Sequence, residues 1–138
     1  MNKALLDTDI YSEILNGINP TVKANAAAYR TVHGVLTLSA VTLMEVLLGY
    51  YQKQALRQLQ TFLANVAVEE VLPFDGATAE LAGRMAGELE RTGQPIGLAD
   101  PMSAAIALTH GLELVTGNAA HFQRVQNLGY PLTLVNWR

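Results

Sequence analysis

Short apolar runs alternate with longer amphipathic stretches along the whole chain. The short runs predict strands at residues 3–7 (KALLD), 35–39 (VLTLS), 68–74 (VEEVLPF), 112–116 (LELVT) and 131–135 (PLTLV). In the longer stretches the apolar residues recur at helical spacing, which predicts helices at 9–15, 20–32, 40–51, 55–67, between Asp75 and Gly93, and at 101–110 and 117–125.

This alternation of strands and helices is typical of the α/β class. Successive strands joined by helices favour right-handed crossovers and parallel pairing. We therefore expect a mainly parallel central sheet of about five strands with helices on both faces. The 138 residues contain no internal repeat, linker or low-complexity segment, so we expect residues 1–138 to form a single domain with one well-buried core.

Composition and charge argue against some classes of function but do not identify a particular one. Half of the residues are apolar and 15% are charged, as in ordinary globular proteins, and the net charge of −3 argues against a broad basic surface for nucleic acid. The chain has no cysteine, which is compatible with the reducing cytoplasm. We expect no export signal, because Asp7 interrupts the apolar stretch after Lys3, and no run reaches membrane-spanning length.

Several polar residues fall where the predicted strands end. Asp7 ends the first strand, Asn118 lies just past the fourth, and Asp100 opens the helix that leads into the fourth. Ligands of open α/β sheets bind at the carboxyl ends of the strands. These residues are therefore candidates for a binding site.

Glu45 is a candidate of another kind. It lies inside a predicted helix whose neighbours are mostly apolar (Val41, Leu43, Met44, Val46, Leu47 and Leu48) and leave hardly any solvent face. A carboxylate in such surroundings needs a partner or a cation.

Most of the other candidates also have a structural interpretation. Asp7 and Asp9 can serve as capping or Asx-turn residues. Asp100 precedes Pro101, which is a strong helix-start signal with Asp as the N-cap. Asn118 alone is an ordinary turn residue. The three histidines, His33, His110 and His121, lie near helix ends and are expected to be surface or dipole-pairing residues.

Other kinds of chemistry lack their usual signals. A zinc site is disfavoured, since there is no cysteine and no pair of histidines at helical spacing. The chain also has no phosphate-binding glycine-rich loop and no Gly-x-Ser-x-Gly elbow. The chemistry that remains available to this chain is the binding of a hard cation by carboxylates.

Four segments, in order, resemble one protein family. They are LLDTDIYSEIL (5–15), LSAVTLMEVLLG (38–49), PFDGATAELAGRMAGELERTGQPIGLADPMSAAIAL (73–108) and LVTGNAAHF (114–122). Together they resemble the PIN-domain ribonucleases and, more narrowly, the VapC-type toxins of bacterial toxin–antitoxin modules. The resemblance implies a PIN-like fold.

The resemblance also implies roles for individual residues. Asp7, Glu45 and Asp100 match the family's metal-ligating acids, and Asn118 falls where many members carry a fourth acid and others carry Asn. Asp9 matches a position that is Asn or Asp and ranks below these. Met44 and Ser103 depart from the family's usual residues, in ways that concern packing more than chemistry.

The implied activity is hydrolysis of RNA by a metal-activated water. A phosphodiester is anionic, so an acidic pocket repels it unless Mg²⁺ or Mn²⁺ reverses the local charge. The metal also lowers the pKa of a water and stabilises charge on the phosphate. The implied partners are an RNA substrate, a small cognate antitoxin protein and a second copy of the chain in a homodimer; the implied location is the cytoplasm.

Two other hypotheses stay open on the sequence alone. The first is a PIN-like protein that binds RNA or a partner without cleaving, which Asn118 in place of a fourth acid would favour. The second is a DNA nuclease with the same acidic site. The absence of long insertions or basic helices argues against the DNA nuclease.

Overall fold

The computed structural model describes all residues from 1 to 138 and has a five-stranded sheet at its centre. The strands are β1 (Ala4–Leu6), β2 (Thr37–Ser39), β3 (Glu70–Leu72), β4 (Glu113–Val115) and β5 (Leu134–Val135). Their order across the sheet is β3-β2-β1-β4-β5, and every neighbouring pair is parallel. The predicted class and the parallel sheet are confirmed; each strand is shorter than its apolar run.

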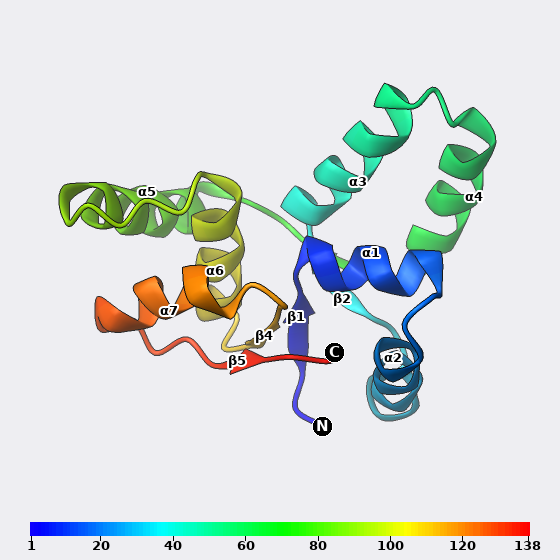
Figure 1. Cartoon of the computed structure of the whole chain (residues 1–138), viewed down its shortest axis with the longest axis horizontal. Coiled ribbons are helices and arrows are strands. Elements are labelled where there is room, and N and C mark those ends of the chain that lie inside the picture. The colour runs from blue at the N-terminus through cyan, green and yellow to red at the C-terminus, as the bar shows by residue number, and fades with distance from the viewer.

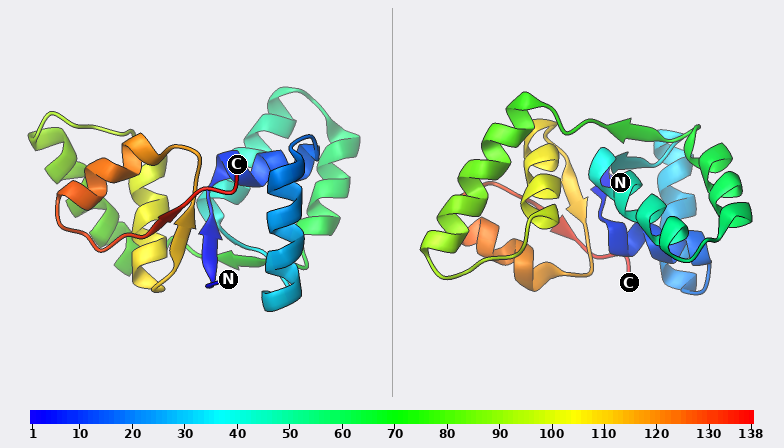
Figure 2. Two further views of the ribbon diagram at one scale, coloured as in Figure 1. Left: turned by 60° about the horizontal axis from the view of Figure 1, so that its bottom comes forward. Right: turned by 90° about the horizontal axis from the view of Figure 1, so that it is seen from above.

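Seven helices connect and cover these strands. They are α1 (Thr8–Asn16), α2 (Pro20–His33), α3 (Ala40–Gln52), α4 (Leu56–Val66), α5 (Gly76–Arg91), α6 (Ala99–Thr109) and α7 (Ala119–Asn127). Helices α1 to α4 lie on one side of β1, and α5 to α7 lie on the other (Figure 1). Two further views show the same division into two groups (Figure 2). None of the helices combines the length and the apolar character needed to cross a membrane.

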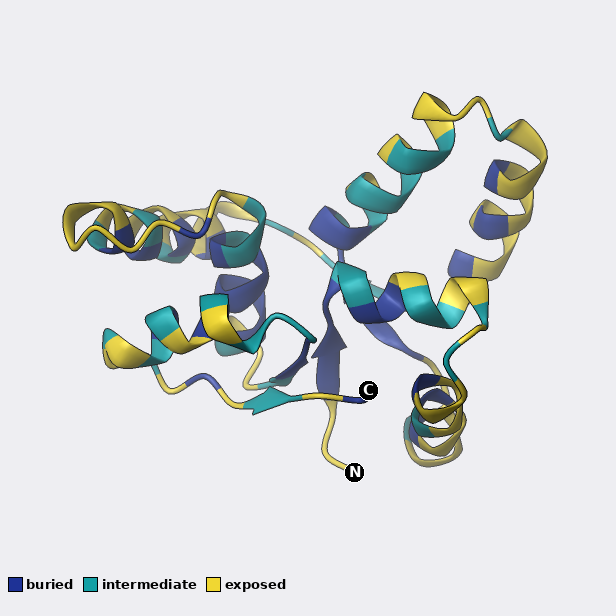
Figure 3. Cartoon of the chain, in the orientation of Figure 1, coloured by how far each residue is buried: buried dark blue, intermediate teal, exposed yellow.

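Side chains of the central strand point alternately into two cores. Ala4 and Leu6 belong to a cluster formed with residues of α1, α2 and α4, whereas Leu5 belongs to a second cluster formed with residues of α5, α6 and α7. All three side chains are buried, and β1 and β2 are buried along their whole length (Figure 3), whereas the outer strands β3 and β5 are only partly buried. Because helices cover both faces of the sheet, a polar ligand can reach it at the ends of the strands: at the carboxyl edge, where the parallel strands finish, or at the amino edge, where they begin.

Side-chain caps set the start of several helices. The Asn19 side chain accepts hydrogen bonds from the backbone amides of Thr21 and Val22. Asp75 and Thr78 form a reciprocal capping box at the start of α5. These bonds fix where the helices begin, and so where the loops at the sheet edges lie.

Candidate active site

The order in which strands are added to the sheet reverses between β1 and β4. From β1 the chain proceeds outward through β2 and β3 and then returns to β4 on the opposite side of β1. In open α/β sheets ligands bind outside the carboxyl ends of the strands at such a switch point. Asp7 directly follows β1, and Thr116, Gly117 and Asn118 directly follow β4.

Asp7 is buried at this switch point and does not cap α1. It occupies the N-cap position by its backbone, but its side chain makes no capping hydrogen bond. Instead, Asp7 Oδ2 accepts a hydrogen bond of 2.9 Å from the Thr116 hydroxyl, across the β1–β4 boundary. The residue is only 8% exposed. The capping interpretation of Asp7 is therefore wrong for its side chain.

The surroundings of Asp7 work against its negative charge. Burial is the main cause that raises its pKa, from 3.8 to about 7, and the nearby carboxylate of Asp9 raises it further. The hydrogen bond from Thr116 acts in the opposite direction, and Asp100 adds a further upward effect. None of the causes is a nearby cation. Asp7 is thus a buried acid whose charge the protein itself does not balance.

Asp9, by contrast, has several partners. Its Oδ1 accepts from the Ile10 amide at 2.7 Å, its Oδ2 accepts from the Gly117 amide at 2.9 Å, and the Arg138 guanidinium lies 3.5 Å away. A Cβ atom on Gly117 would clash with the Arg138 guanidinium and lie 2.9 Å from Asp9 Oδ2, so a larger residue here would displace the ends of these two side chains. Asp9 therefore ties α1 to the segment after β4.

Asp100 lies in the first turn of α6 rather than at its cap. The helix begins at Ala99, the N-cap position is Leu98, and no side chain caps it. The prediction that Asp100 caps a helix starting at Pro101 is therefore wrong. Proline is tolerated there because amides of the first turn have no partner within the helix. Asp100 Oδ2 lies 2.9 Å from His121 Nδ1, and its side chain is 20% exposed.

Glu45 reaches the same edge of the sheet from α3. Its Oε1 accepts a 2.6 Å hydrogen bond from the Thr8 hydroxyl, whose oxygen also lies 2.9 Å from that of Thr42. Glu45 is half-buried. The expectation that α3 leaves hardly any solvent face is wrong, because Met44 is 52% exposed and Leu48 is 50% exposed. Glu45 is thus fixed beside Thr8, the residue that follows Asp7.

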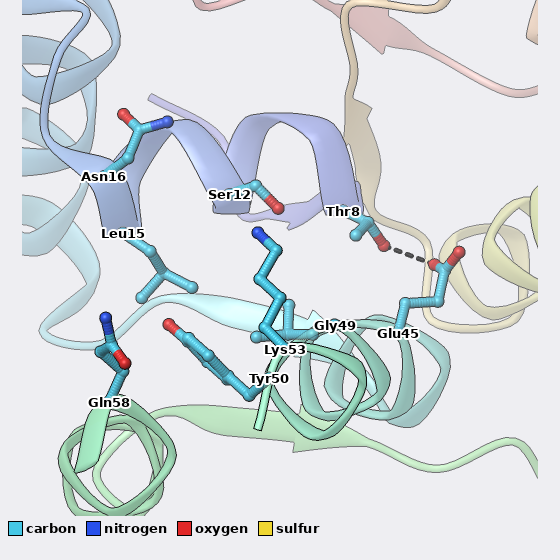
Figure 4. A pocket seen from close by; sticks show the side chains of 10 residues that line it. Thr8, Ser12, Leu15, Asn16, Glu45, Gly49, Tyr50, Lys53 and Gln58 are labelled. Carbon is cyan, nitrogen blue, oxygen red and sulfur yellow. Dashed lines mark hydrogen bonds between the residues drawn. The ribbon is translucent and has the colours of Figure 1, made fainter. Parts of the chain in front are cut away.

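A groove runs from Glu45 between α1, α3 and α4. Figure 4 shows Thr8 and Glu45 joined by their hydrogen bond at one end and Tyr50 and Gln58 farther along. Lys53 is the one cationic side chain among its lining residues, which are Thr8, Ser12, Leu15, Asn16, Glu45, Val46, Gly49, Tyr50, Lys53 and Gln58. The groove therefore connects a carboxylate of the site with an ammonium group.

Asn118 and His121 lie at the start of α7. Asn118 occupies the N-cap position without a side-chain capping bond, and its Nδ2 lies 2.9 Å from His121 Nδ1. Sequence reasoning missed His121 as a site residue and expected it on the surface or paired with a helix dipole. It instead lies near a helix N-terminus, where the dipole disfavours a cation. The available signal was its spacing, one turn after Asn118.

The other two histidines lie at helix C-terminal ends, as expected. His33 is the last residue of α2 and stacks on Tyr29 with ring centroids 4.4 Å apart. His110 is the C-cap of α6 and is exposed. Both are placed at the opposite ends of their helices from the acidic edge.

The structure brings the predicted acids together only in part. Asp9 and Asp100 are close enough to raise the pKa of Asp7, and Glu45 is joined to the adjacent Thr8. However, no three histidine, aspartate or glutamate side chains converge closely enough to hold a metal ion. The donors fit a hard divalent cation in kind, since they are carboxylate and amide oxygens and the buried Asp7 lacks a positive partner.

Comparisons with known proteins agree with this arrangement. A family model described as PIN domain matches residues 4–128. The chain is 34% identical over 129 residues to the tRNA(fMet)-specific endonuclease VapC of Shigella flexneri, covering 93% of this chain and 96% of that protein. It is 28% identical over 137 residues to Ribonuclease VapC2 of Rickettsia felis, with 96% of each chain covered.

Solved VapBC structures share the fold of this chain. The fold matches the crystal structure of DNA-bound VapBC from Salmonella typhimurium with a TM-score of 0.83 and 28% identity, and the match covers all of both chains. A second match is VapBC2 from Rickettsia felis, bound to a DNA fragment from its promoter. Its TM-score is 0.79 at 25% identity, and 98% of each chain is covered.

Proposed function

The chain belongs to the PIN-domain family and, within it, to the VapC ribonucleases of toxin–antitoxin modules, and from this we propose that it is a metal-dependent endoribonuclease acting at the carboxyl edge of its sheet. The observation that carries the proposal is the buried Asp7, whose pKa burial raises to about 7 with no cation near it. Two further acids, Asp9 and Asp100, lie close enough to add to this effect. Such an edge attracts a divalent cation.

Asp7, Glu45 and Asp100 would hold the cation, with the amide of Asn118 beside them. Their oxygens suit Mg²⁺ or Mn²⁺. When bound, the cation supplies the positive charge that an RNA phosphate requires and lowers the pKa of an attacking water. The chain's own contribution is placement: Thr116 fixes one oxygen of Asp7 and Thr8 fixes one oxygen of Glu45.

RNA would approach along the groove that begins at Glu45. The net charge of −3 leaves no broad basic surface, so backbone contacts must be local. Lys53 lines this groove (Figure 4) and is suited to contact a phosphate that follows the cleaved bond or precedes it. Lys53→Gln should weaken RNA binding and reduce its salt dependence without changing the melting temperature.

A small antitoxin protein would block this site. The VapBC structures from Salmonella and Rickettsia support the existence of such a partner. A cationic side chain of the partner would find an unbalanced carboxylate at Asp7. Expression of the chain alone should arrest growth, and co-expression of the neighbouring gene product should relieve the arrest. Harmless high-level expression of a protein that cleaves RNA would contradict the toxin role.

A second copy of the chain would cover the exposed face of α3. Six apolar residues line a hollow there: Ala40, Leu43, Met44, Leu47, Leu48 and Tyr51. Met44, Leu48 and Tyr51 are at least half exposed, and a face of this kind is typical of an interface. Leu48→Glu should convert a dimer into a monomer in light scattering, whereas Val32→Glu, at an exposed apolar position on α2, should not.

The proposed activity can be tested with purified protein, Mn²⁺ and total RNA. We expect cleavage that leaves 5′-phosphate and 3′-hydroxyl ends, as a metal-activated water produces when it attacks the phosphorus and the 3′ oxygen leaves. Glu45→Gln should abolish it, because the side chain keeps its shape but loses a ligand charge. Glu80→Gln, on the exposed face of α5, is the matched control. Wild-type activity in Glu45→Gln would exclude Glu45, and cleavage of DNA in place of RNA would reassign the substrate.

A further inference from the structure

The segment after β4 and the helix α7 that follows it place a hydrogen-bonding group beside each of the three aspartates at the carboxyl edge. The Thr116 hydroxyl donates to Asp7, and the Gly117 amide donates to Asp9, both at 2.9 Å. His121 Nδ1 lies 2.9 Å from Asp100 Oδ2. In each case the bond engages Oδ2; Oδ1 of Asp9 accepts from the Ile10 amide, whereas Oδ1 of Asp7 and of Asp100 has no side-chain partner.

The bond between His121 and Asp100 has a defined direction. A carboxylate oxygen accepts hydrogen bonds, so the ring Nδ1 must carry the hydrogen and donate it to Asp100 Oδ2. The same Nδ1 lies 2.9 Å from the Asn118 amide. An Nδ1–H that donates to Asp100 cannot also accept from the Asn118 Nδ2, so this tautomer assigns the hydrogen bond of Nδ1 to Asp100.

Asp100 has no other side-chain partner to fix its orientation. The only hydrogen bond and the only ion-pair contact of its carboxylate are with His121. The two residues lie 21 positions apart, on α6 and α7. Removal of the imidazole therefore leaves the Asp100 carboxylate free to rotate into solvent, toward which its side chain is already 20% exposed.

We propose that His121 is a positioning residue for Asp100: its Nδ1–H engages one carboxylate oxygen and leaves the other available to bind the cation. This inference rests on the proposed function, since it needs Asp100 to be a ligand. Hydrogen-bonding partners of ligating groups commonly contribute 10- to 100-fold to metal affinity. His121, one turn beyond Asn118, thus acts on the site as a hydrogen-bond donor to a ligand and not as a ligand itself.

The test is the affinity of the metal-free protein for Mn²⁺ alone, measured by titration calorimetry without RNA. We expect His121→Ala to weaken Mn²⁺ binding roughly 10- to 100-fold. His121→Asn should restore most of the affinity, because its amide nitrogen takes the place of Nδ1, whereas the longer His121→Gln should not. His110→Ala is the control, since His110 is exposed at the far end of α6. Thermal melting of each metal-free variant checks that it folds.

A double-mutant cycle separates positioning from a general structural effect. In an Asp100→Asn background, His121→Ala should cause no further loss of Mn²⁺ affinity, because the group on which it acts has gone. Wild-type affinity in His121→Ala, or an undiminished loss in the Asp100→Asn background, overturns the inference alone. Failure of the wild-type protein to bind Mn²⁺ overturns the proposed function and the inference with it.

Discussion

The two edges of the sheet shift carboxylate pKa values in opposite directions: that of Glu70 at the amino edge is lowered, and that of Asp7 at the carboxyl edge is raised. At the amino edge, Glu70 begins β3 and lies 2.8 Å from the Lys3 ammonium, while the Thr37 hydroxyl donates to it at 2.9 Å. The hydrogen bond from Lys3 is the main cause that lowers the pKa of Glu70, and the bond from Thr37 adds to it. The charge at this edge is balanced within the chain.

At the carboxyl edge, no positive group in the chain balances the charge of Asp7. Burial raises the pKa of Asp7 to about 7, and Asp9 and Asp100 raise it further. The nearest cation, Arg138, lies beside Asp9 and Glu13. Asp7 and Glu70, at opposite edges of the same parallel sheet, thus differ in two respects: Asp7 is the more deeply buried, and the chain supplies a positive partner only to Glu70. The unbalanced edge is the one suited to an external cation.

The largest effect is expected from removal of the buried charge. Because the folded state raises the pKa of Asp7 from 3.8 to about 7, the native protein holds this proton more tightly than the unfolded chain. Its contribution to stability is fully present below pH 3.8 and is lost as pH rises to about 7. Asp7→Asn should therefore stabilise the metal-free protein at pH 8, by at most about 4 kcal/mol.

Urea denaturation in EDTA between pH 4 and pH 8 measures this difference. The wild-type protein should lose stability across the range relative to Asp7→Asn, and the two should converge near pH 4. Parallel curves across the whole range would contradict the account of Asp7. RNA cleavage by Asp7→Asn should be lost despite its greater stability.

A smaller effect is expected at Asp100. Asp100→Asn keeps an oxygen that can accept from His121 but removes one of the like charges near Asp7. The metal-free variant should be as stable as wild type or more stable, by about 1 kcal/mol or less. The melting-temperature increase that Mn²⁺ causes should shrink, and cleavage should collapse. A variant that responds to Mn²⁺ and cuts RNA like wild type would leave the site one carboxylate short.

The smallest effect, of opposite sign, is expected at the amino edge. Lys3 lowers the pKa of Glu70 below 4.5, so this pair stabilises the protein above pH 4.5, and the contribution is lost as pH falls. The two side chains are 47% and 37% exposed, so Glu70→Gln should cost about 0.2–1 kcal/mol at pH 7. Denaturation curves should show this loss at low salt and less of it in high salt. A stability gain comparable to that of Asp7→Asn would erase the contrast between the edges.

Local signals in the sequence predict most of the fold. Strands and helices alternate as the apolar pattern indicates, and Asp7 falls at the end of β1 as expected. The sequence does not locate the start of α6, because proline is compatible with more than one position of a first turn. Nor does it indicate the exposed face of α3. Apolar spacing does not distinguish a face that packs within the chain from one left on its surface.

The candidate site is less predictable than the fold. Residue type and position select Asp7 and Asp100, but only the structure reveals that His121 contacts Asp100, since the two lie 21 residues apart on different helices. The difference between Asp7 and Asp9 is also tertiary. Asp9 is occupied by the Gly117 amide and Arg138, and no sequence pattern near residue 9 indicates either contact.

The central claim is that the carboxyl edge is built to receive a divalent cation, and metal-dependent melting tests it most directly. The metal-free protein is melted at pH 8 with and without excess Mn²⁺, beside Asp7→Asn. Saturation at about 100 times Kd should add about 2.7 kcal/mol of stability to the wild-type protein. Its melting temperature should therefore rise by several degrees, while that of Asp7→Asn, already higher without metal, stays nearly unchanged. An unchanged wild-type melting temperature, or an equal rise in both proteins, would contradict the claim.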